Sequence, residues 1–174
     1  GNLALLPTRK RCHRIGVLLD KAMDDELRGR HLQVANAAKA TLGLDIGASA
    51  VTSRPIGVRL GLSESGASWG QVDDEEALID GARKLVEMGC TAIAVVARFP
   101  EEEDDDTHSL QKSFDAYRQG CGVDTIAGAE AIVSRVISKA LNIPCAHAPA
   151  FDPVEYGTFT HFILHFKGCF DLNN

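Results

Sequence analysis

The chain has 174 residues, a formal net charge of −6 and a hydrophobic fraction of 45%. This length suits a single domain, and the apolar fraction suffices for a buried core. The acidic charge argues against a nucleic-acid-binding protein, which usually presents a basic face. Apolar runs are far shorter than the roughly 20 residues that span a bilayer, so we expect no membrane helix. Scattered cysteines without CxxC spacing argue against a disulfide framework and a structural zinc site.

The first part of the chain predicts a strand followed by a helix. Residues 14–20 have the apolar pattern of a buried strand that ends in a polar residue. The helix is expected over 24–41, with acidic residues in its first turn and Gly43 at its end. Residues 46–62 then predict one or two short strands, and the small residues of 65–70 predict a loop.

The remaining elements continue the alternation of strand and helix. They are a helix over 74–88 capped by Asp73, a strand over 91–97, helices over 109–117 and 125–141, and a strand over 144–148. The strand over 91–97 is apolar throughout, which is typical of parallel strands covered on both faces. The alternation predicts a Rossmann-like α/β fold with a mainly parallel sheet flanked by helices. We expect one domain over 1–151 and a divergent C-terminal tail over 152–174.

Polar residues that follow the predicted strands are the first candidates for a site. Ligands of an open parallel sheet gather at the carboxyl ends of its strands. Asp20, Arg98 and His147 each lie at such an end. Arg98 could neutralise a ligand charge, and His147 could exchange a proton because imidazole titrates near neutral pH. Cys145 shares a strand face with His147, but the roughly 6.5 Å between them argues against a direct thiolate–imidazole pair.

A glycine-rich segment leads into the predicted helix over 125–141. Free N–H groups at a helix N-terminus attract phosphate and carboxylate groups, which makes Asp124 and Thr125 candidates for ligand contacts. A structural turn explains the same glycines. The spacing matches neither a P-loop nor the dinucleotide-binding fingerprint.

Three further side chains complete the set of candidates. Glu130 lies beside the apolar register of its helix, so it either pairs with Arg98 or His147 or points to solvent. Ser68 and Trp69 lie in the predicted loop, where a hydroxyl and an indole could form one wall of a pocket. A turn anchored by one large apolar side chain is the alternative.

Five segments together resemble one protein family. They are GASWG at 66–70, AIAVVARFP at 92–100, GVD at 122–124, AGAEA at 127–131 and IPCAHAPA at 143–150. Their order resembles an uncharacterised family of cyanobacteria and plant plastids known only as a domain of unknown function. The resemblance covers about residues 3–151 and implies a longer parent protein in the plastid or the cyanobacterial cytoplasm. It implies no reaction, and no cofactor or catalytic role is carried over.

Two functions remain open from the sequence, and whether the protein is an enzyme is undecided. The first is binding or conversion of a small anionic metabolite in a pocket at the carboxyl edge of the sheet. His147 and Glu130 would be its catalytic residues, and the ligand would contact Ser68, Trp69, Arg98, Asp124 and Thr125. The second is a non-catalytic binding or assembly protein of the plastid, for which the acidic loop over 101–106 is either a partner surface or a solvated turn. No metal is expected in either case.

Overall fold

A computed structural model describes residues 13–100, 116–117, 119–121, 124 and 126–150. The acidic loop over 101–106, most of the helix predicted over 109–117, Thr125 and the tail over 152–174 lie outside these residues. The predicted division into one domain and a tail therefore stays a prediction.

A parallel sheet forms the centre of the described structure. Its strands are β2 (Ile46–Val51), β1 (Ile15–Leu19), β5 (Ala92–Arg98) and β6 (Cys145–Ala150), in that spatial order. Each neighbouring pair is parallel. The strand order reverses between β1 and β5. Strand β2, the next strand in the sequence, pairs with one edge of β1, and β5 pairs with the other edge. The predicted α/β class with a mainly parallel sheet is confirmed.

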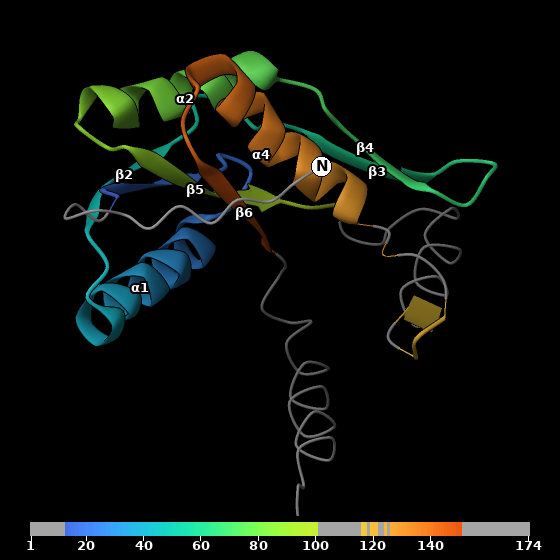
Figure 1. The fold of residues 1–174 in the computed structure, drawn as a ribbon, viewed down its shortest axis with the longest axis horizontal. Helices are drawn as coiled ribbons and strands as arrows, with labels where there is room; N and C mark the ends of the chain where they lie inside the picture. Colours follow the sequence, from blue (N-terminus) through green and yellow to red (C-terminus); the bar gives the residue numbers. More distant parts are fainter. Residues whose placement is uncertain (1–12, 101–115, 118, 122–123, 125, 151–174) are drawn as a thin grey trace, which may run out of the picture.

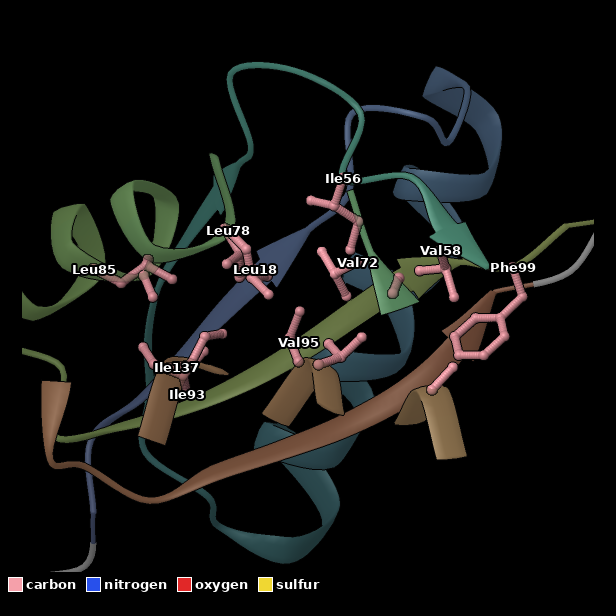
Figure 2. Packing of buried hydrophobic residues seen from close by; sticks show 14 of the residues in the cluster. Leu18, Ile56, Val58, Val72, Leu78, Leu85, Ile93, Val95, Phe99 and Ile137 are labelled. Carbon is pink, nitrogen blue, oxygen red and sulfur yellow. The ribbon is translucent and has the colours of Figure 1, made fainter. Parts of the chain in front are cut away.

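Helices cover both faces of this sheet, as predicted. Helices α2 (Glu75–Glu87) and α4 (Ala127–Leu141) lie on one side, and α1 (Asp25–Leu42) lies on the other (Figure 1). The larger hydrophobic cluster packs on the α2/α4 side, where Leu18, Val95 and Ile137 are among its fully buried members (Figure 2). A smaller cluster on the α1 side contains residues of β1, α1 and the ends of β5 and β6.

A second, antiparallel sheet departs from the Rossmann-like expectation. Strands β3 (Val58–Leu62) and β4 (Ser68–Val72) form a hairpin between β2 and α2 in the sequence. The prediction of a loop over 65–70 is therefore wrong for its second half. Gly66, with φ of 79°, helps to make the turn, and β4 then alternates between exposed and more buried residues.

Two predicted boundaries need correction. The N-cap of α2 is Asp74, whose carboxylate accepts a hydrogen bond of 2.8 Å from the backbone N–H of Ala77. Asp73, the predicted cap, instead forms an ion pair with Arg59. The last strand extends through Pro149, which is tolerated because β6 is an edge strand among the described residues.

Candidate functional site

His147 lies within β6 rather than at its end, which corrects the predicted position. It is the third residue of the strand and stands opposite Val95 of β5 in the register. Val95 packs in the cluster beneath α2 and α4, and neighbouring residues in a register share a face. The imidazole therefore projects toward α4, where its Nδ1 lies 2.9 Å from the hydroxyl of Ser134.

Glu130 approaches the same imidazole from the first turn of α4. Its Oε2 lies 3.9 Å from Nε2 of His147, which is beyond direct hydrogen-bond distance. The side chains of Glu130 and His147 are 19% and 32% exposed. The sequence left Glu130 a choice between His147, Arg98 and solvent, and the structure places it next to His147.

Burial is the main influence on the ionisation of Glu130. It raises the pKa of the carboxyl, the neighbouring His147 lowers it, and the carboxyl of Asp124 raises it again, with a net upward shift. Among the causes of that shift, the only other acidic group is Asp124, which is half-buried just before α4. A raised pKa makes Glu130 a better proton donor near neutral pH than an ordinary glutamate.

Asp124 is held at the entrance to α4 by a local hydrogen bond. Its Oδ1 accepts from the backbone N–H of Ile126 at 3.1 Å, which occupies one of the N–H groups at the start of the helix. The predicted group of Asp124, Glu130 and His147 is thus gathered at one end of α4. Thr125 lies outside the described residues.

The glycines of two sequence motifs serve close packing between β4 and α4. A Cβ added to Gly70 would lie 2.1 Å from Cα of Ala129, and one added to Gly128 would lie 2.8 Å from Cα of Trp69. Only glycine permits such an approach of the two backbones. This contact places Ser68, two residues before Gly70, beside the first turn of α4.

The indole of Trp69 does not join the group around His147. Adjacent residues of a strand point to opposite faces, and Gly70 faces α4. The indole instead lies across Gly61 of β3, where an added Cβ would come within 2.3 Å of it, and Trp69 is 45% exposed. Gly61 is needed here to make room for the ring.

Arg98 projects from the opposite face of the sheet. Its neighbours Ala97 and Phe99 both pack in the cluster beneath α2 and α4, so strand alternation directs Arg98 toward the α1 side. His147 and Glu130 lie on the α4 side. The structure therefore brings together three of the predicted site residues but does not gather Arg98 and Trp69 with them.

The Cys145 thiol is a poor candidate for a nucleophile. It is partly buried against the large cluster, and burial raises its pKa to about 12. A thiol with that pKa stays protonated at neutral pH. Only the deprotonated thiolate is a good nucleophile. This agrees with the sequence argument against a thiolate–imidazole pair.

Asp20 is a buried strand-end residue with a structural environment. Its carboxylate accepts hydrogen bonds from the backbone N–H groups of Ala22, Ile56 and Arg98, at 3.1 to 3.2 Å. Burial raises the pKa of Asp20, and the three N–H donors oppose that shift. The Asp20 side chain therefore links the end of β1 to the end of β5 and to the segment before β3.

The described residues offer no metal centre, and the depression that they line lies away from His147. Within the described ranges, no group of three or more acidic, histidine or cysteine side chains could hold a metal ion. A shallow depression of about 440 Å³ lies between α2 and α4, with Glu75, Arg135 and Lys139 among its lining residues and none of the predicted ones.

The described helices include none with the length and apolarity to cross a bilayer.

Comparison with known proteins places the chain in a family. The family model described as "Protein of unknown function (DUF3326)" matches residues 1–160. The chain belongs to this family. It is 50% identical over 154 residues to an uncharacterised lipoprotein of a Synechococcus species, an alignment that covers 88% of the chain and 41% of that protein. The chain thus spans less than half the length of this relative. No solved structure matches it.

Ser134 is the functional candidate that the sequence interpretation missed. A serine in the middle of a helix has no distinguishing pattern of its own. Its spacing of four residues from Glu130 places both on one face of α4, and this spacing is the available signal. It became informative only once β6 was seen to bring His147 to that face.

Proposed function

We propose that this protein binds and converts a small metabolite at the α4–β6 surface, with His147 and Glu130 exchanging a proton with it. One observation carries the proposal: Nε2 of His147 and Oε2 of Glu130 face each other at 3.9 Å from two different elements. A single polar atom beside the line between them can lie about 2.8 Å from both, within hydrogen-bond distance. A hydroxyl group fits this position because it can donate to Nε2 and accept from a protonated carboxyl.

The charge of the metabolite is constrained by its surroundings. The sequence predicted an anionic ligand with Arg98 as its counter-charge, but that side chain belongs to the other face of the sheet. The carboxyls of Asp124 and Glu130 adjoin the site. An anionic metabolite would therefore bind with its hydroxyl between Nε2 and Oε2 and its negative charge directed away from Asp124. Ser68, beside the start of α4, would contact the outer part of the ligand.

Mass spectrometry of small molecules that copurify with the protein tests this function. We expect a bound species in the wild type, and a loss of at least about tenfold in His147→Gln and in Glu130→Gln, equivalent to about 1.4 kcal/mol of binding. Glu87→Gln is the matched control, since Glu87 is an exposed residue at the end of α2. Retention of the species by both site variants, or no species in the wild type, would refute the proposal.

The finer statements about fold and location belong to the same proposal. A Rossmann-like description is supported by the reversal of strand order at β1 and β5, which is typical of doubly wound sheets. A location in the plastid or the cyanobacterial cytoplasm is supported by the family resemblance and by the free thiols of Cys90, Cys121 and Cys145. Fractionation of host cells with an antibody against the protein tests it.

The alternative function, a non-catalytic plastid binding or assembly protein, is favoured by a different observation. Among the described residues β6 pairs only with β5, and its Ala146 and Ala148 are exposed. An unpaired strand edge can accept a strand from another chain, and a second copy of this protein is the simplest one. Light scattering would then show a dimer that Ala148→Lys dissociates. A monomer at all concentrations would exclude this self-association.

A further inference from the structure

The His147 ring is held between two side chains of the same helix. Ser134 Oγ lies 2.9 Å from Nδ1, and Glu130 Oε2 lies 3.9 Å from Nε2. The two nitrogens of a neutral imidazole differ, since one carries a proton and the other a lone pair. Which nitrogen is the base therefore depends on the hydrogen bond that Ser134 makes.

The hydroxyl of Ser134 has acceptors for its own proton in the preceding turn of α4. The carbonyl oxygens of Glu130 and Ala131 lie 3.4 and 3.3 Å from Oγ, in positions to accept from it. A serine that donates to a helix carbonyl presents its lone pairs elsewhere. With the hydroxyl proton directed at either carbonyl, a lone pair of Oγ is left for Nδ1, and the ring nitrogen is then the donor in the 2.9 Å contact.

We propose that Ser134 is a positioning residue that fixes the tautomer of His147, with the proton on Nδ1 and the basic lone pair on Nε2. The inference deepens the function proposed above and rests on it for its purpose. The lone pair then points to the side of Glu130, where the hydroxyl of a metabolite would bind. Without Ser134 the ring could rotate or exchange tautomers, and Nε2 would carry a proton where the reaction needs a base.

The acidic groups near the ring relate each tautomer of His147 to a protonation state of Glu130. On the α4 side, the carboxyl of Glu130 lies next to the ring, and the carboxyl of Asp124 influences Glu130 in turn. A lone pair on Nε2 can accept the proton of a neutral Glu130 or of a bound hydroxyl. A proton on Nε2 would instead suit an ionised Glu130. The two tautomers thus correspond to two different protonation states of the site, which a spectroscopic measurement separates.

Long-range proton–nitrogen NMR of the full chain, labelled with ¹⁵N-histidine, tests the proposal at a pH where His147 is neutral. The wild type should show the pyrrole-type signal for Nδ1 and the pyridine-type signal for Nε2. Ser134→Ala should shift the population toward the opposite pattern, and Ser134→Thr, which keeps a hydroxyl, should restore the wild-type pattern. Ser138→Ala is the matched control, since that hydroxyl lies one turn further along α4 and donates to the carbonyl of Arg135.

Two results would overturn the assignment. One is a proton on Nε2 in the wild type, and the other is a tautomer that Ser134→Ala leaves unchanged in a folded protein, as judged by circular dichroism. Neither result depends on a bound metabolite. A wrong function would appear as unchanged metabolite binding in His147→Gln, so the two failures can be told apart.

Discussion

The two faces of the parallel sheet differ in how firmly they are covered. On the α2/α4 face, α2 alone contributes four fully buried residues at 0% exposure, Ala77, Leu78, Ala82 and Leu85. On the other face, α1 has Leu27 as its buried residue, while Val34 is 66% exposed. The candidate site lies on the firmly packed face. Packed helices hold side chains in fixed rotamers, which a site that depends on the 2.9 Å contact between Ser134 and His147 requires.

The largest expected effect is a difference between two leucine truncations. Leu85→Ala, on the packed face, should lower the free energy of unfolding by about 3–5 kcal/mol, because it leaves a cavity in a rigid cluster. Leu27→Ala should cost about 2 kcal/mol, since the smaller cluster around it can relax. Urea unfolding followed by circular dichroism measures both. Equal costs would show that the α1 face is as well packed as the other.

The contact between β4 and α4 gives the next effect. Gly70→Ala should destabilise the protein by about 1–3 kcal/mol, because its methyl group would overlap the backbone of Ala129. It should also weaken metabolite copurification, since the start of α4 carries Glu130. Unchanged stability would mean that β4 can move away from α4 without cost, and that the hairpin does not position the helix.

These features show how far the sequence could lead. The unbroken apolar run of β5 predicted a strand covered on both faces, and the structure has one. Strand β4 could not be predicted, because Ser68, Trp69 and Gly70 lack the alternation and β-branching of a typical strand. Its extended form depends on pairing with β3 and on backbone contact with α4, which are not visible locally.

The candidate site was predictable in part for a similar reason. Sequence periodicity placed Glu130 near the inner side of its helix and His147 on a strand, and both are found there. Whether a strand-end residue such as Arg98 shares a face of the sheet with His147 depends on which helix covers which face. The order of the elements in the sequence does not give this. The partner of the Ser134 hydroxyl is His147, and this pairing depends on the position of β6, which the sequence does not give.

A smaller effect of opposite sign is expected on the exposed helix. Gly29 lies within α1, and a Cβ added there would meet nothing within 4 Å. Gly29→Ala should therefore stabilise the protein by about 0.5–1 kcal/mol through helix propensity alone. Thermal unfolding would record it as a raised midpoint. A destabilised variant would mean that α1 packs more closely in solution than its exposed residues indicate.

The smallest effect is a change in the pH dependence of stability that comes from Glu130 on the packed face. Burial raises the pKa of folded Glu130 above its unfolded value, so its contribution to stability is full below the unfolded pKa and is lost as pH rises through the folded pKa. Glu130→Gln stays neutral and should remove this loss, so its unfolding free energy falls less steeply between about pH 4.3 and neutrality. Urea midpoints measured across that range, with the exposed Glu87→Gln as control, give the two slopes. Parallel curves for Glu130→Gln and the wild type would mean that the carboxyl ionises as freely as one in water. The packed face would then not hold a proton donor beside His147.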